Sequence, residues 1–260
     1  VRQQLTDDYH KAPDDYADED EDYLVDRLID VIKTANLNIT EKAMINPELK
    51  GMGTTMTLAF ARQSDLSIVH VGDSRAYQVD GLDGSIRQLT ADHSFVQALV
   101  DAGHITAEEA ENHPMRNVLY RALGQDQNVD VDKYTDLRLG VGDRLILCSD
   151  GLTLHVKPHE IADIVMENSD PSMATEKLLE LANKRGGKDN ISVIVVAVES
   201  TIGDDTTQAN LKAINDDTTV PIAPYYEDTD TVKMDQYADH DPKSYKDGYG
   251  EGSDTNEPSQ

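Results

Sequence analysis

Hydrophobic residues recur at helical spacing near the start of the chain and then give way to short runs rich in β-forming residues. The helical spacing predicts one helix over residues 23–44, with one face packed on a core. Four short β-rich runs follow it, separated by turns that contain Gly, Asp and Ser. We interpret these runs as the strands of an antiparallel meander, at residues 54–61, 66–71, 75–79 and 86–89.

Beyond residue 90 the pattern is mostly helical, with two strongly apolar strands. The expected strands are 144–149, whose apolar centre indicates burial on both faces, and 191–198. Helices are expected at residues 95–102, at a short segment opened by the capping-box pattern of 106–109, and at 117–123, 158–168 and 172–184. Because strands and helices come in separate runs, the pattern indicates an α+β fold and not alternating parallel βαβ units.

Charge and composition divide the 260-residue chain into three regions. Residues 1–22 are predicted to be an acidic loop or helix remnant, and residues 23–200 a folded domain. Residues 201–260 hold 14 Asp and Glu against 4 Lys and Arg and show no apolar periodicity. Such a segment buries too little apolar surface to offset its ordering entropy, so we predict an acidic disordered tail.

Composition also argues against several classes of protein. The formal net charge of −27 disfavours a nucleic-acid binder, because that class presents a basic surface. No apolar run approaches the roughly 18 residues of a membrane-spanning helix, so no membrane insertion is expected. Cys148 is the single cysteine, which excludes a disulfide scaffold and is typical of a cytoplasmic protein.

Three aspartates at predicted strand ends are candidates for chemistry. Asp73 lies in a tight turn after a strand, Asp150 follows a buried strand, and Asp189 precedes the last strand. If these ends coincide, a cation must balance the three carboxylates, and hard oxygen ligands suit Mg²⁺ or Mn²⁺. Aspartate in a turn with Gly or Ser is also ordinary turn chemistry, so the residues alone leave both interpretations open.

Four further side chains are expected to have structural roles. His70 is expected to be packed on its strand or associated with the turn, and Cys148 to be a small core residue. His93 is expected to bond the backbone at a helix start. Arg75 is expected to form a salt bridge with the carboxylate of Asp73.

Five motifs occur in order along the chain: GMGTT at 51–55, VHVGDSR at 69–75, LTADHS at 89–94, CSDGL at 148–152 and GKDNIS at 187–192. Together they resemble the bacterial branch of the PP2C (PPM) family of metal-dependent protein serine/threonine phosphatases. The resemblance runs from about Tyr23 to Glu199. It implies a β-sandwich of two antiparallel sheets flanked by helices, which agrees with the α+β pattern.

The resemblance also implies roles for the aspartates. Asp150 and Asp189 resemble ligands of a binuclear Mg²⁺ or Mn²⁺ centre, and Asp73 resembles a ligand of a third, weaker metal. The stretch 93–124 corresponds to a mobile flap that influences substrate choice. The implied reaction is hydrolysis of phosphoserine and phosphothreonine in proteins by direct attack of a metal-bound hydroxide. The implied partners are phosphorylated proteins, among them a Ser/Thr kinase that the enzyme opposes.

The sequence departs from the family at its start. The family begins with a strand bearing a phosphate-gripping Arg, then an Asn-Glu-Asp motif, then an Asp-Gly-x-Gly-Gly-His motif that supplies a bridging ligand and an acid. None of these is in the sequence. The expectation is therefore a domain that lacks its first strands and retains no catalytic residues apart from the metal ligands. The alternative to an active enzyme is a truncated, catalytically weak or inactive remnant that acts as a binding module.

Overall fold

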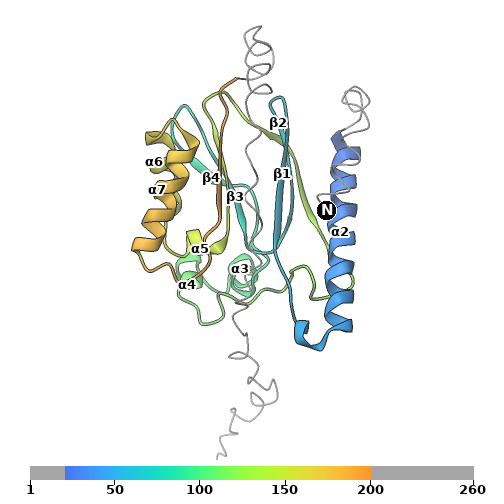
Figure 1. Ribbon diagram of the computed structural model, residues 1–260. Coiled ribbons are helices and arrows are strands. Elements are labelled where there is room, and N and C mark those ends of the chain that lie inside the picture. The colour runs from blue at the N-terminus through green and yellow to red at the C-terminus, as the bar shows by residue number, and fades with distance from the viewer. Residues whose placement is uncertain (1–20, 201–260) are drawn as a thin grey trace, which may run out of the picture. The chain divides into compact units, whose positions relative to one another are not determined.

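Two antiparallel sheets form the centre of residues 21–200, the part of the chain that the computed structural model describes (Figure 1). One sheet has the strand order β1-β2-β5 and the other β4-β3-β6-β7. The strands are β1 (Met56–Arg62), β2 (Asp65–Val71), β3 (Arg75–Val79), β4 (Ile86–Gln88), β5 (Asp132–Arg138), β6 (Arg144–Cys148) and β7 (Val193–Ala197). The predicted α+β sandwich is confirmed.

Helices cover the outer faces of both sheets. Figure 1 shows α2 (Glu21–Ile45) beside the sheet that contains β1 and β2, and α6 (Pro158–Glu167) and α7 (Pro171–Lys184) beside the other sheet. The predicted helix at 23–44 is therefore confirmed, as are those at 158–168 and 172–184. Shorter helices are η1 (Pro47–Leu49), α3 (Phe95–Asp101), α4 (Ala107–Glu111) and α5 (Asp150–Thr153).

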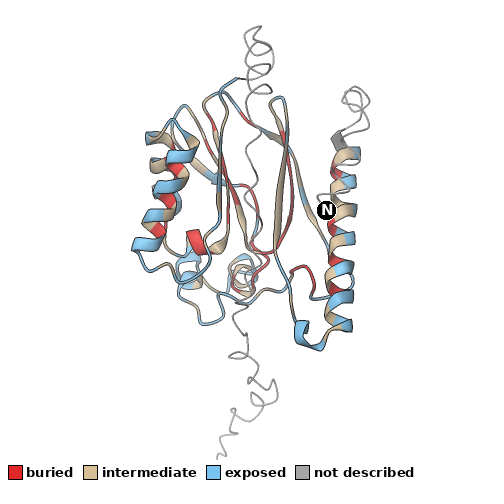
Figure 2. Ribbon diagram, in the orientation of Figure 1, coloured by how far each residue is buried: buried red, intermediate tan, exposed pale blue. Residues whose placement is uncertain are grey.

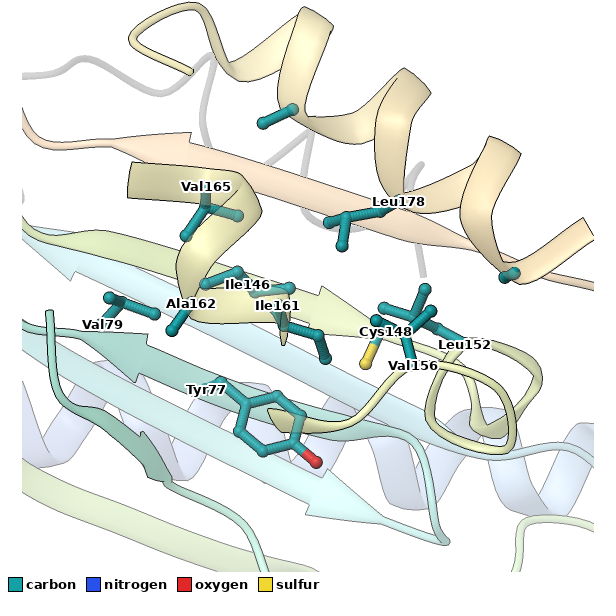
Figure 3. Close-up of a cluster of buried hydrophobic side chains, with 12 residues drawn as sticks. Tyr77, Val79, Ile146, Cys148, Leu152, Val156, Ile161, Ala162, Val165 and Leu178 are labelled. Carbon is teal, nitrogen blue, oxygen red and sulfur yellow. The ribbon is translucent and has the colours of Figure 1, made fainter. Parts of the chain in front are cut away.

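Buried apolar side chains form three clusters that match these layers. Figure 2 colours the ribbon by burial and shows buried residues on the strands and on the helices that flank them. Leu66 of β2 and Leu145 of β6 belong to the cluster between the sheets. Ile32 of α2 packs with Val69 of β2 in the second cluster. The third cluster joins β3 and β6 to the three helices α5, α6 and α7 (Figure 3). Each fully buried side chain of this kind contributes about 1.5–3 kcal/mol.

The predicted meander is wrong in its connectivity. The β1–β2 and β3–β4 hairpins form as expected, but β2 and β3 lie in different sheets. The chain crosses between the sheets at residues 72–74, and β3 then pairs with β6, which lies about 70 residues further along. Spacing along the sequence indicates two consecutive strands. It does not show whether they pair in one sheet or lie in two different sheets. The crossing places Asp73 between the two sheets.

Two further predictions need correction. Residues 117–123 are not helical, because Leu119 bridges to Ser94 and Leu123 bridges to Thr54, and these pairings hold the segment extended. Two elements were not predicted: β5, whose side chains are mostly polar and only partly buried, and the four-residue α5. The capping box at Thr106 and Glu109 is present and opens α4 as expected.

Several predictions fall on residues that are not described. The acidic region at 1–22 lies almost wholly outside the described residues, although α2 already begins at Glu21, and the predicted tail at 201–260 lies entirely outside them. Among the described helices, none combines the length and the hydropathy needed to cross a membrane.

Candidate functional site

The turn that carries Asp73 is held by side chains from several segments. Thr57 on β1 donates a hydrogen bond from its hydroxyl to the carbonyl of Ser74 at 3.0 Å. The hydroxyls of Thr55 and Ser74 are joined at 2.8 Å. Both threonines come from the segment that follows η1 and enters β1, so the turn is cross-linked to that segment.

Glycine is required at the first position of this turn. Gly72 has φ +117°, a value that L side chains rarely adopt. A Cβ at this position would lie 2.3 Å from Cγ2 of Thr55 and 2.5 Å from its Cβ. The close approach lets Thr55 pack directly on the backbone of the turn, which fixes the direction in which Asp73 leaves β2.

Two buried histidines contact the same glycine. His70 lies on β2, and its Nε2 donates to the carbonyls of Gly72 at 3.0 Å and of Ala91 at 3.1 Å. The backbone N–H of Gly72 donates to Nδ1 of His93 at 3.0 Å. Burial, together with the nearby His93, lowers the pKa of His70, and the Nδ1 atom of its ring lies 2.9 Å from the Thr57 hydroxyl. The structural role predicted for His70 is confirmed.

His93 bonds the backbone of a different segment from the one predicted. Ser94 is the N-cap of α3 and accepts from the backbone N–H of Gln97, so His93 does not cap that helix. Its ring instead accepts from the turn before Asp73, and its backbone N–H donates to the Gly72 carbonyl at 2.7 Å. His93, which was predicted to bond the backbone at a helix start, therefore binds the turn that carries Asp73.

Asp150 begins the short helix α5, directly after β6. The preceding Ser149 is joined to the segment before β7 by three hydrogen bonds: its hydroxyl donates to the carbonyl of Asn190 and accepts from the N–H of Ser192, and its own N–H donates to the Ser192 carbonyl. A Cβ on Gly151 would lie 2.5 Å from the Asn190 carbonyl oxygen. This close approach brings the Asp150 and Asp189 segments together.

Asp189 differs from the other two carboxylates because it is exposed. Its Oδ1 accepts from the backbone N–H of the next residue, Asn190, at 2.7 Å. The charges of the predicted ligands influence one another in two pairs, Asp73 with Asp150, which also line one cavity, and Asp150 with Asp189. Asp150 is the member that the two pairs share.

The electrostatics of this group follow from burial and crowding. Burial, reinforced by the charge of Asp150, raises the pKa of the Asp73 carboxyl to about 6. Burial and the charge of Asp189 also raise the pKa of Asp150. Both shifts disfavour the ionised carboxylates, and a bound cation would reverse that preference.

The donors present suit a divalent cation only in part. Within the described residues, no group of three or more His, Cys, Asp or Glu side chains is arranged to hold a metal ion. The two carboxylate pairs nevertheless offer hard oxygen donors of the kind that bind Mg²⁺ or Mn²⁺ together with several waters. The residues therefore fit a hydrated divalent cation held by two carboxylates, and they do not form a closed three-ligand cage.

A cavity of about 410 Å³ opens beside two of these carboxylates. Asp73 and Asp150 line it, together with residues of α3, α4 and the segment after α4. Three cationic side chains also line it, Arg75, Arg116 and Lys157. A hollow that combines carboxylates with cationic groups can accept a cation and an anionic ligand side by side.

Arg75 forms a different ion pair from the one predicted. Its guanidinium binds the carboxylate of Asp92, with Nη2 at 2.7 Å from Oδ2, and donates from Nη1 to the Tyr77 hydroxyl at 3.0 Å. Despite the opposing effect of burial, these bonds raise the pKa of Arg75. Gln88 also donates to Asp92 at 3.1 Å. Asp92 was missed as a site residue, although it stands beside His93 in one of the five motifs.

Asp132 at the start of β5 was missed as well. It accepts from Nε2 of His93 at 3.0 Å and from Arg121, and these hydrogen bonds lower its pKa although burial acts in the opposite direction. No local pattern marks Asp132, because its partner His93 is 39 residues away and its strand is mostly polar.

Comparison with known proteins identifies a group of similar chains. The family described as "Protein phosphatase 2C" matches residues 3–192. A serine/threonine phosphatase stp of Listeria welshimeri is 41% identical over 165 residues, which cover 64% of this chain and 64% of the relative. The serine/threonine protein phosphatase PstP of Mycobacterium tuberculosis is 38% identical over 175 residues, or 67% of this chain and 33% of the relative.

Solved structures agree with the sequence matches. The crystal structure of the serine/threonine phosphatase Stp1 from Staphylococcus aureus superposes with a TM-score of 0.66 at 38% identity, covering 70% of each chain. The catalytic domain of PstP in complex with two manganese ions gives a TM-score of 0.60 at 35% identity, covering 70% of this chain and 75% of that one. The chain spans 64% of the length of the Listeria relative, so the matches cover a large part of such proteins but not all of them.

Proposed function

Because the chain belongs to the protein phosphatase 2C family, we propose that it hydrolyses phosphoserine and phosphothreonine in proteins. The observation that carries the proposal is the pair of Asp73 and Asp150, whose carboxylates interact and line one cavity together with cationic side chains. Curated relatives that carry the same name, serine/threonine phosphatase, support the substrate class.

In this proposal the three aspartates hold divalent cations, Mg²⁺ or Mn²⁺. Asp150 contributes to both carboxylate pairs, with Asp189 on one side and Asp73 on the other. A cation bound there would polarise water for attack on phosphorus and balance the charge of the phosphoryl group. The PstP structure that contains two manganese ions supports a centre of more than one ion.

Three cationic side chains in the cavity lining, beside four carboxylates, offer contacts for a phosphate ester. Arg75 is committed to Asp92 and Tyr77, so it contributes a fixed positive charge in the cavity wall near the carboxylates. Lys157 is paired with Glu111 of α4. Arg116 also lines the cavity, where its guanidinium can approach an anionic substrate. The substrate phosphate would thus lie between carboxylate-bound cations and arginine.

The setting proposed for this activity is the cytoplasm, with phosphorylated proteins as substrates and a Ser/Thr kinase as the opposing enzyme. The single buried cysteine supports a reducing compartment. We also propose that residues 23–200 belong to the phosphatase domain and that the 260-residue chain by itself turns over slowly. The sequence holds no Asp-Gly-x-Gly-Gly-His motif, and loss of a general acid typically removes about 10²–10⁴-fold in rate.

The test is phosphate release from a phosphothreonine peptide by the 260-residue chain, with Mn²⁺ and with a chelator. We expect slow turnover that requires Mn²⁺ and is abolished in Asp150→Asn. Asp163→Asn, a change on the exposed face of α6, is the matched control and should leave turnover unchanged. Turnover that survives chelation or Asp150→Asn would overturn the proposal. Saturable peptide binding with no turnover would instead favour the binding-module alternative.

A further inference from the structure

His93 lies where four segments around the site meet. Its ring accepts a hydrogen bond from the N–H of Gly72, directly before Asp73, and contacts Asp132 at the start of β5. Its backbone carbonyl accepts from the N–H of Tyr120 at 3.0 Å. The ring is buried, with 1% of the residue exposed. The contacts therefore join the turn of Asp73, the start of β5 and both ends of the segment 94–119.

The hydrogen bonds fix which nitrogen of the ring carries the proton. A backbone N–H can only donate, so Nδ1 of His93 must be the acceptor for Gly72. The proton is then on Nε2, which donates to Oδ2 of Asp132 at 3.0 Å. Arg121 lies beside the same nitrogen and directs its own proton to the other oxygen of Asp132. The ring is oriented by a carboxylate on one side and holds the turn with the other.

Both polar groups of the Gly72 backbone are used in this arrangement. The N–H is bound by the His93 ring, and the carbonyl accepts from the backbone N–H of His93 and from the ring of His70. Because Gly72 has φ +117° and lacks a side chain, these bonds are what restrict its backbone. The position of the next residue, Asp73, depends directly on them.

The same residue is tied to the segment 94–119. Beyond the bond from Tyr120, the N–H of Phe95 donates to the carbonyl of Val118 at 2.8 Å, so the two ends of that segment pair side by side. This segment carries α3 and α4, which form a wall of the cavity. If α3 and α4 moved where this segment begins and ends, the hydrogen bonds of His93 would be the first to change.

We propose that His93 is a positioning residue that fixes the Asp73 carboxylate and joins it to the base of the α3–α4 segment. The inference rests on the proposed function only for what Asp73 holds, a divalent cation. Outer partners of metal ligands typically change metal affinity by about 10–100-fold when they are removed. The Nδ1 acceptor is the part of His93 that matters for this role, and the contact with Asp132 orients it.

Two substitutions separate the two halves of the ring. In His93→Asn the amide oxygen can take the place of Nδ1 and still accept from Gly72, but the link to Asp132 is lost. In His93→Gln the amide nitrogen can take the place of Nε2 and still donate to Asp132, but the acceptor for Gly72 is lost. His104→Gln, at an exposed histidine, is the control for an unrelated change of the same kind.

The primary readout is hydrogen exchange at the Gly72 amide, followed by NMR on the full chain without metal. We expect protection at Gly72 to be kept in His93→Asn and His104→Gln and to fall by more than about 10-fold in His93→Gln. The second readout is Mn²⁺ affinity by titration, where we expect weakening of about 10-fold in His93→Gln and within about 3-fold of the parent in His93→Asn.

The outcomes are distinct. Full Gly72 protection in His93→Gln would overturn the inference, and so would equal loss of protection in both variants, because that pattern indicates general loosening. A parent chain that binds no Mn²⁺ and releases no phosphate would overturn the proposed function, while the exchange result would still decide the role of His93.

Discussion

The turn at residues 72–74 and the loop at residues 186–190 each present an aspartate to the same site, but they are built differently. The turn is buried at Gly72 and half-buried at Asp73 and Ser74, and it is bound by Thr55, Thr57, His70 and His93. The loop is exposed, and its aspartate is held by the N–H of its own neighbour, Asn190. Buried side chains therefore position the Asp73 side of the site, and an exposed loop positions the Asp189 side.

This difference shows how a site can be both fixed and adjustable. Cross-links from separate segments resist movement of Asp73, because several bonds must break together for the turn to shift. Asp189 can shift toward a bound ligand while breaking fewer hydrogen bonds, since the backbone of an exposed loop opens at a low cost in free energy. Asp150 stands between them, on a short helix whose N-cap Ser149 is bonded to the same loop.

The largest effect is expected from a methyl group in the turn. Gly72→Ala places a Cβ 2.3 Å from Thr55 at φ +117°, so we expect a loss of about 3 kcal/mol in the free energy of unfolding. Gly186→Ala in the loop has φ +130° but meets its nearest atom, on His155, only at 3.6 Å, so about 1 kcal/mol is expected. Chemical denaturation of both variants measures the two losses in the free energy of unfolding. Equal losses would show that the turn is no more tightly packed than the loop.

A smaller effect, about 2 kcal/mol, is expected when the ion pair near the turn is broken. Arg75→Met leaves Asp92 without its main partner, in a side chain that is only 10% exposed. Arg185→Met breaks the corresponding pair with Glu160 near the loop, which lies at the surface, and should change stability much less. Should Arg185→Met prove as destabilising as Arg75→Met, burial would not be what distinguishes the two regions.

The smallest effect is a gain in stability with a defined pH dependence. The pKa of Asp73 in the folded chain, about 6, lies above the ordinary value of 3.8, so the folded state binds a proton more tightly than the unfolded state. Without metal, the contribution of Asp73 to stability should therefore rise as the pH falls from about 6 to about 4. Asp73→Asn should lose that rise and be about 1 kcal/mol more stable near neutral pH, allowing for partial exposure.

Denaturation in a chelating buffer across this pH range checks the prediction for Asp73. If Asp73→Asn had the same pH profile as the parent, the ionised Asp73 carboxylate would not be destabilised by burial and by the charge of Asp150. Asp163→Asn, which changes an exposed carboxylate, should keep the profile of the parent and serves as the control.

The sequence predicted most elements because their apolar patterns are regular. The long stripe of α2 and the short apolar runs of β2, β3 and β6 were found close to their observed bounds. The crossing at residues 72–74 could not be predicted, since it depends on β3 pairing with a strand far along the chain. The polar strand β5 was missed for a similar reason: it is defined by its pairing with β2 and not by its own composition.

The candidate site was predicted in the same uneven way. The aspartates were identified from motifs and strand ends, and the structure links them in pairs through Asp150. The residues that hold them were missed or given other roles: Arg75 was assigned to Asp73 instead of Asp92, and His93 to a helix start. Such partners are brought together by tertiary contacts, so a local pattern carries little information about them.

The measurement that tests the central claim most directly is Mn²⁺ binding by the parent chain and by Asp150→Asn. Asp150 is shared by both carboxylate pairs, so the variant should lose affinity by more than about 100-fold, beyond the 10–100-fold expected for outer partners. Asp163→Asn should bind as the parent does. Equal Mn²⁺ affinity in Asp150→Asn and the parent would show that these aspartates do not form the metal site.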